Sequence, residues 1–503
     1  MGNIPIGNAT PDSSKGLLNM HRRITIAVLA LPVAAWLAGC ASTAGLAPSS
    51  SRRDADALAA RHTLQDAQVA AKAWPARDWW KVLNDSQLDA LMDEALRGSP
   101  TLNIAAARTR KALAAADASA TALSPRIDGS ASSTRERFSE NGLMPPPLGG
   151  STHTVNQLQA TLSWEIDFWG KNRAAYEAAL GTARAAEVDA YAARLALSTN
   201  IAQAYVQLQR AYLLHDVAAA TLAERERIYA LTRDRNAAGL DSRLELKQAE
   251  SALPATREEL VQLDERMALA RNQIAALMGA GPDRGQAIER PSGVALASAT
   301  LPTTVPAELI GRRPDVVAQR WRIEAAGRDI ASAKAQFYPN VNLVAFVGLQ
   351  SLGAANLLAA ASGMAGAGPA ITLPIFDAGR LRANLAGKDA DYDIAVEQYN
   401  QTLADAMRDV VDQLASFRSV AAQRAQQEQA LATTREAYDL ALLRYREGLG
   451  NYLQVLSAEQ PLLAQQSLDA DLRARELELS INLVRALGGG YEPPFTLGVA
   501  DAK

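Results

Sequence analysis

The sequence predicts a mainly α-helical fold with a small β part, laid out twice along the chain as an internal duplication. Long helical stretches with few breaks predict the mainly α-helical fold. Turn residues that recur at a nearly constant spacing indicate the duplication. Two prolines return 214 residues later and a glycine turn returns 209 residues later, the pairs being Pro100 and Pro314, Pro125 and Pro339, and Gly239 and Gly448. Each copy must therefore form the same elements in the same order.

The composition argues against several classes of function. Its 503 residues carry a formal net charge of −3, and basic residues alternate with acidic ones along helical faces, which argues against nucleic-acid binding. The four histidines lie far apart and there is one cysteine, so metal sites and disulfides have almost no ligands. No Ser-His-Asp grouping, metal spacing or phosphate loop appears. We expect no catalytic residue, no metal and no cofactor, and hence no enzyme.

The N-terminus is typical of an exported protein. A basic segment precedes an apolar run at 24–37 that is too short to span a bilayer comfortably. The run ends in Leu37-Ala38-Gly39-Cys40, which resembles the lipobox of bacterial lipoproteins. Residues 1–39 are then a signal peptide, with Met20 as a second candidate start, and Cys40 would carry lipid as the mature N-terminus. The competing interpretation makes Cys40 a small buried apolar residue.

Four segments have the alternation of a two-sided strand, with an apolar residue at every second position. They have about the length, roughly 9–11 residues, that a tilted strand needs to cross hydrocarbon. Bacterial membrane barrels start at about eight strands, so several copies of the chain must combine to close one. The alternative is a small soluble sheet covered by helices. The predicted strands span about 126–138, 155–166, 340–350 and 367–376.

The other regular segments are predicted helices, two of them longer than an ordinary domain is wide. From 170 to 236 there is no proline, and about 65 residues at roughly 1.5 Å each would extend on the order of 100 Å. Apolar residues at heptad spacing predict a packing seam along it. Pro254 and Pro461 should kink or end their helices early. The seam contains Ile201, Tyr205, Leu208 and Tyr212, and the predicted helices span about 99–123, 170–237, 241–278, 313–337, 379–446 and 451–487.

Each long outgoing helix ends in a glycine turn that carries one leucine. Glycine permits the left-handed conformation that ends a helix, and Asp241 or Asn451 is suited to cap the next one. The leucine either packs locally as a hydrophobic staple or is exposed at the tip, and its presence in both copies favours a docking surface. The candidate docking residues are Gly239, Leu240, Asp241, Gly448, Leu449 and Gly450.

Several short segments together resemble a known family. They are Leu37-Ala38-Gly39-Cys40, Asp78-Trp79-Trp80, Gly311-Arg312-Arg313-Pro314-Asp315-Val316, Ala335-Gln336-Phe337-Tyr338-Pro339, Ile375-Phe376-Asp377-Ala378-Gly379-Arg380 and Tyr445-Arg446-Glu447-Gly448-Leu449 with Asn451-Tyr452-Leu453. This set resembles the outer-membrane factor family of TolC-like and OprM-like efflux lipoproteins, particularly its NodT-type branch. The resemblance covers nearly the whole chain after Cys40.

The resemblance implies a homotrimer with a twelve-stranded outer-membrane β-barrel, continued by a long periplasmic α-helical barrel. It also implies contact with outer-membrane lipid, and a tip that meets a periplasmic adaptor protein linked to an inner-membrane pump, of the RND type. The mature chain would then divide into a lipidated N-terminus and linker at 40–73, a first repeat at 74–285, an equatorial connector at 286–312, a second repeat at 313–490 and a tail at 491–503.

The resemblance further implies a constriction at the start of the last long helix, where inward-facing residues close the tip. Leu453 matches its apolar position, whereas Gln454 and Ser457 stand where relatives carry acids. This departure should weaken cation preference, because carboxylates in a pore act through their fixed field. Three nearby carboxylates could supply charge elsewhere, namely Asp241, Glu245 and Glu459.

These features favour a passive exit duct for small molecules such as drugs, located in the outer membrane and extending into the periplasm. Two alternatives remain open. One is an outer-membrane duct of the type I secretion kind, and the other is a lipid-anchored periplasmic coiled-coil scaffold without a pore. No motif identifies the exported substrate, since specificity in such exporters usually resides in the pump.

Overall fold

The computed structural model describes residues 42–54, 75–292 and 312–492, which fall into two compact units. The predicted signal peptide and Cys40 lie outside the described residues, as does most of the predicted connector at 286–312. Among the described residues, the first unit comprises 42–51, 113–181 and 323–395, and the second comprises 52–54, 75–112, 182–292, 312–322 and 396–492.

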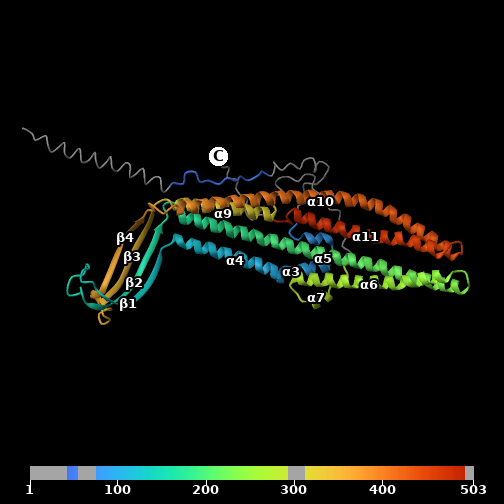
Figure 1. Ribbon diagram of the computed structural model, residues 1–503, viewed down its shortest axis with the longest axis horizontal. Helices are drawn as coiled ribbons and strands as arrows, with labels where there is room; N and C mark the ends of the chain where they lie inside the picture. Colours follow the sequence, from blue (N-terminus) through green and yellow to red (C-terminus); the bar gives the residue numbers. More distant parts are fainter. Residues whose placement is uncertain (1–41, 55–74, 293–311, 493–503) are drawn as a thin grey trace, which may run out of the picture. The chain divides into compact units, whose positions relative to one another are not determined.

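The first unit holds a four-stranded antiparallel sheet in the order β1-β2-β3-β4 (Figure 1). Every strand therefore pairs with its neighbour in sequence, and β1 and β4 are the two edges. The register places Ile127 opposite Leu162, and Leu162 opposite Ala345. The strands are β1 Arg126–Arg137, β2 Thr152–Ile166, β3 Asn340–Leu352 and β4 Gly363–Thr372.

The predicted bounds of the fourth strand, 367–376, were wrong at both ends. Gly363 already faces Leu349 in the ladder, and the pairing ends where Thr372 faces Asn340. The start is Gly363-Met364-Ala365-Gly366, in which small residues give little hydrophobic alternation to detect. The end comes two residues before Pro374, which has no N–H to donate to a ladder. The second strand also begins earlier than predicted, at Thr152.

The helices follow the duplicated plan, and α5 and α10 have 67 residues each. The first predicted helix is shorter than expected, because its last turn is a separate 3₁₀ turn, η3. In the described part of the chain, no helix combines the length and apolarity that a bilayer crossing requires. The elements are η2 Trp79–Leu83, α3 Ser86–Gly98, α4 Pro100–Ala120, η3 Thr121–Leu123, α5 Lys171–Ala237, α6 Arg243–Met278, α7 Pro282–Gln286, α9 Pro314–Ala335, η4 Ala360–Ser362, α10 Arg380–Arg446 and α11 Tyr452–Ala486.

Pro254 and Pro461 do not end their helices. The sequence predicted either a kink or an early end at each proline, and the early end is wrong. Both lie inside continuous helices, α6 and α11. Each has a buried leucine as its neighbour, Leu253 before the first and Leu462 after the second. Packing of these neighbours offsets the hydrogen bond that a proline cannot donate, since most helix stability in proteins comes from tertiary contacts.

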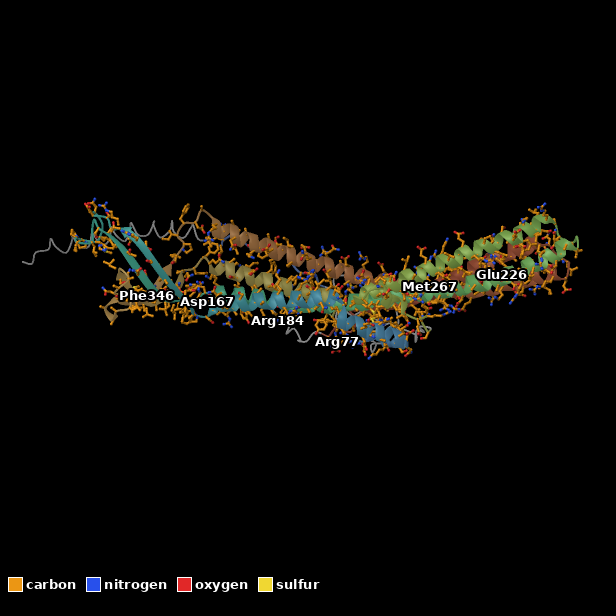
Figure 2. All side chains as sticks on the ribbon, turned by 90° about the horizontal axis from the view of Figure 1, so that it is seen from below. Arg77, Asp167, Arg184, Glu226, Met267 and Phe346 are labelled. Atoms are coloured by element: carbon orange, nitrogen blue, oxygen red, sulfur yellow. The ribbon has the colours of Figure 1, made fainter. Side chains whose placement is uncertain are left out.

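The predicted heptad seam forms the core of the second unit. Ile201, Tyr205 and Leu208 are fully buried on α5. They belong to one apolar cluster with Met267 of α6, which Figure 2 labels, and with Ile481 of α11. The tryptophan pair of η2 is buried in the same cluster and therefore acts as a packing anchor.

The segment after the predicted lipidation site is not a free tether. In the first unit, the backbone N–H groups of Ser49 and Ser50 and the Ser49 hydroxyl donate to the Asp393 carboxylate on α10. These hydrogen bonds lower the pKa of Asp393 below its ordinary value. Arg382 donates to the carbonyls of Ser42 and Ala44. The segment is thus fixed along the start of α10.

Candidate functional site

The two long outgoing helices end in the same way, by a Schellman motif. In the first copy, Leu240 N–H donates to Arg235 O over 2.9 Å, while Gly239 N–H donates to Asn236 O. In the second copy, Leu449 N–H donates to Arg444 O over 2.8 Å. Gly239 and Gly448 have a φ of +76°, the left-handed conformation that the motif needs.

The turn leucines are exposed. Leu240 exposes 67% of its surface and Leu449 exposes 70%. A Schellman motif usually packs this residue against the side chain five positions earlier, but here those positions are Arg235 and Arg444. The interpretation of each turn leucine as a local hydrophobic staple is therefore wrong. Each tip presents an apolar side chain to its surroundings.

Asp241 does not cap the next helix, although the sequence suggested that it could. Ser242 caps α6 in a capping box with Glu245, and Asn451 caps α11 as expected. The Asp241 carboxylate, with 3% of its side chain exposed, instead accepts hydrogen bonds from Arg235 Nε over 3.0 Å and from Tyr445 Oη over 2.6 Å. Asp241 thereby joins the first-copy turn to α10 of the second copy.

Sequence reasoning missed this tip network of Thr232, Arg235, Asp241 and Tyr445. Tyr445 is fully buried, shares a 2.8 Å hydrogen bond with Thr232, and lies under the Arg235 guanidinium. Burial first, and the hydrogen bond to Asp241 second, raise the pKa of Tyr445 to about 12. The signal in the sequence was a break in the duplication, because the position equivalent to Asp241 is Gly450.

The predicted constriction residues lie together at the start of α11. Leu453 exposes 55% of its surface, and Gln454 and Ser457 are also exposed. Ser457 Oγ donates to Leu453 O over 2.8 Å, within one helical turn. The three residues fall within about one helical turn, and none of their side chains carries a charge.

The three carboxylates considered as alternative sources of charge are already engaged. Asp241 is paired as described, and Glu245 accepts from Ser242 N–H over 2.6 Å. Glu459 is buried, with both carboxylate oxygens 3.0 Å from Arg225 of α5. Asp241 and Glu459 are thus each paired with an arginine of their own chain, whereas Glu245 keeps its negative charge because its partner is a neutral backbone N–H.

The sheet has one apolar and one mainly polar face, since residues directly opposite each other in the ladder share a face. Apolar side chains lie in register across all four strands, and several are strongly exposed, including Ile127, Val347 and Ile371 at 71%, 62% and 67%. Polar residues such as Gln159 and Thr161 occupy the other parity. The apolar face consists of Ile127, Gly129 and Ala131 of β1, Leu158, Ala160, Leu162, Trp164 and Ile166 of β2, Val341, Leu343, Ala345, Val347 and Leu349 of β3, and Gly363, Ala365, Ala367, Pro369 and Ile371 of β4.

This alternation, apolar toward lipid and polar toward a lumen, defines the class of transmembrane β-barrel proteins. Within the described ranges, no group of three histidine, cysteine or carboxylate side chains is placed to hold a metal ion. The tips and the two-faced sheet are therefore the features that need a functional explanation.

The chain belongs to the outer membrane efflux protein family, whose model matches residues 91–280 and 305–489. It is 42% identical to the fusaric acid resistance protein FusA of Burkholderia cepacia, over 73% of this chain and 69% of that protein. It is 32% identical to the multidrug resistance outer membrane protein MdtP of Escherichia coli K12, over 85% and 89% of the two chains.

Solved structures agree with the family assignment. The outer membrane protein VceC of Vibrio cholerae is 38% identical, with a TM-score of 0.78 over 83% of this chain and all of that one. The outer-membrane channel OprN is 27% identical, with a TM-score of 0.80 over 90% and 98% of the two chains. The fold is that of the trimeric outer-membrane channels, a β-barrel continued by an α-helical barrel, and the protein is an efflux channel of the outer membrane.

Proposed function

We propose that this chain forms the passive exit duct of a tripartite exporter, as a homotrimer whose twelve strands close one barrel. The observation that carries the proposal is the two-faced sheet with two open edges, β1 and β4. Unpaired edge groups cannot face lipid, because hydrocarbon offers no hydrogen-bonding partner. Pairing β4 of one copy with β1 of the next satisfies both edges and keeps the apolar face outward.

The tips dock a periplasmic adaptor that links the duct to an inner-membrane pump of the RND type. Leu240 and Leu449 are the anchors, since an exposed leucine in a fixed turn can enter an apolar groove with little loss of conformational freedom. The flanking glycines, Asp241 and Gly450 shape the two turns. The chain catalyses no reaction, and the pump supplies the energy.

Leu453, Gln454 and Ser457 form the constriction behind the tips. With a leucine ring and two uncharged polar rings, the constriction selects by size and hydration more than by charge. The relatives are named for resistance to fusaric acid and to multiple drugs. We therefore assign small organic molecules, drugs among them, as the cargo.

Cys40 carries the lipid that anchors each protomer to the membrane. The contacts of Asp393 and Arg382 with residues 42–50 support this proposal, because they lead the chain along the start of α10, shortly after β4.

The docking role is tested by charged replacements at the tips. We expect the double variant Leu240→Asp, Leu449→Asp to lower resistance to an exported drug by about tenfold or more, because a carboxylate is costly to bury in an apolar groove. The matched control is Leu143→Asp, which changes a fully exposed leucine in the loop between β1 and β2. Resistance is measured in cells that lack other exit ducts, with trimer amounts quantified by detergent gels. Full resistance in the double variant would contradict the docking assignment.

A further inference from the structure

A cavity of about 600 Å³ lies in the first unit, where the strands give way to helices. Three junctions form its wall, namely those between β2 and α5, between α9 and β3, and between β4 and α10. Figure 2 labels Asp167 at the first of these junctions. The polar side chains that matter in its lining are Glu165, Asp167, Lys171, Asn340 and Arg380.

Part of this polar lining is already paired. Lys171 Nζ lies 2.5 Å from Glu165 Oε1, so these two charges neutralise each other. One carboxylate oxygen of Asp167 accepts from Arg173 N–H over 2.8 Å. The other Asp167 oxygen makes no hydrogen bond with any residue in the described ranges.

Among the described residues, the polar groups that remain unpaired are the positive charge of Arg380 and two acceptor oxygens, one of Asp167 and one of Asn340. The Arg380 guanidinium has no ion pair or hydrogen bond to another side chain in the described part of the chain. Asn340 Oδ1 is buried, and no described residue donates to it. A buried acceptor without a donor is costly, so the cavity favours a ligand that brings both a donor cation and an anion.

Aromatic side chains at the cavity suit the surface of a membrane. Trp169 stacks on Tyr338 with the ring centroids 4.7 Å apart, and Trp169 Nε1 donates to Pro339 O over 2.8 Å. Both rings are about half exposed, and Phe168 nearby is 66% exposed. Rings with one apolar and one polar end gather where hydrocarbon meets headgroups. The strands cross the outer membrane, so this junction lies at its periplasmic surface.

We propose that the cavity binds the headgroup of a zwitterionic phospholipid of the phosphatidylethanolamine class. Arg380 holds the phosphate, since a guanidinium matches phosphate oxygens in a bidentate fork. The ammonium donates to Asp167 and Asn340, which together use two of its three donors and fill the vacant acceptors. The acyl chains leave past Phe168 toward the apolar face of the sheet. The inference rests on the outer-membrane location and not on transport.

The charge pattern favours this lipid over simpler anions. Inorganic phosphate could occupy Arg380 but would bring negative charge near the Asp167 carboxylate and no cation to balance it. Phosphatidylglycerol can donate from its headgroup hydroxyls to Asn340, but it also lacks a positive charge for Asp167. A segment of a second copy is the remaining competitor for the cavity, and the experiment below separates it from lipid.

The test is a lipid titration of purified trimers in detergent, followed by native mass spectrometry. The wild type is expected to retain phosphatidylethanolamine more tightly than chain-matched phosphatidylglycerol, and Arg380→Gln to weaken that retention by about tenfold. Arg380→Lys should restore part of it, and Asp167→Asn should weaken retention of phosphatidylethanolamine but not of phosphatidylglycerol, because only the ammonium gains from the carboxylate charge. The matched control is Arg173→Gln. Arg173 lies two residues after Lys171 of the cavity lining, but its side chain is 77% exposed and does not line the cavity.

Several outcomes would overturn the inference. Equal retention of the two lipids, displacement of the bound lipid by inorganic phosphate, or unchanged retention in Arg380→Gln would each do so. Trimers that bind no lipid at all would overturn it as well. Conductance is measured on the same preparation, so a channel that conducts without retaining lipid contradicts this inference and leaves the duct intact.

Discussion

At the scale of single residues, Asp241 and Tyr445 decide how the tip is held. Asp241 accepts from Tyr445 and from Arg235, and all three groups lie within one chain. Burial and the Asp241 hydrogen bond both favour the neutral phenol of Tyr445, which is why its pKa rises to about 12. A phenol whose pKa is higher in the folded chain stabilises the fold below about pH 10, and this contribution is lost between about pH 10 and 12.

We predict that Tyr445 ionises at a higher pH than an ordinary tyrosine, and that the Asp241 carboxylate contributes to this shift. Subtracting the alkaline absorbance titration of Tyr445→Phe from that of the wild type isolates this phenol. Its ionisation should appear near pH 12, and in Asp241→Asn it should move toward the ordinary value of about 10, because the carboxylate no longer opposes the phenolate. A titration that is the same with and without Asp241 would contradict the network.

Sequence reasoning identified the tip residues but not their contacts. Leu240 and Leu449 could be predicted because glycine turns have a strong local signature. The bond from Asp241 to Tyr445 joins positions 204 residues apart. Local spacing carries no information about such a contact, so Asp241 was assigned to the nearest helix start, where Ser242 is the cap.

At the scale of elements, a buried ion pair fixes α5 against α11. Arg225 binds both oxygens of Glu459 over 3.0 Å and also donates to Thr256 of α6 over 2.7 Å. Burial disfavours the charge on Arg225, but the hydrogen bonds to Glu459 and its field outweigh this and raise its pKa. The three helices therefore meet at this one buried polar cluster.

We predict that removing one partner of this pair destabilises the helices strongly. Glu459→Leu leaves a buried, unpaired guanidinium and should cost about 3–5 kcal/mol, whereas the double variant Arg225→Met, Glu459→Leu should recover most of that loss. Thermal unfolding followed by circular dichroism measures the effect.

The control is an exposed pair that joins the same region of α5 to α6. Arg257 and Glu226 are 2.9 Å apart with about half of each side chain exposed, and Figure 2 labels Glu226. Glu226→Gln should cost less than about 1 kcal/mol, as exposed pairs do. Equal losses in the buried and exposed variants would show that Arg225 and Glu459 do not fix the helices.

At the scale of the whole molecule, the duplication explains both what the sequence could predict and what it could not. Alternation and heptad spacing repeat in both copies, so the number and order of strands and long helices were predictable. The start of β4 was not, because Gly363 and Ala365 give no hydrophobic signal and are placed by their pairing with β3. The path of residues 42–50 was not predictable either, because it depends on hydrogen bonds to Asp393, which lies more than 300 residues away in the sequence.

Several copies of the chain close the sheet around a continuous passage. A lipid-anchored scaffold without a pore would use the same helices but would leave no route for ions. The most direct measurement is the single-channel conductance of the purified protein in a planar bilayer. We expect discrete conductance steps from detergent-stable trimers, whereas folded protein that inserts without any conductance would contradict a continuous passage.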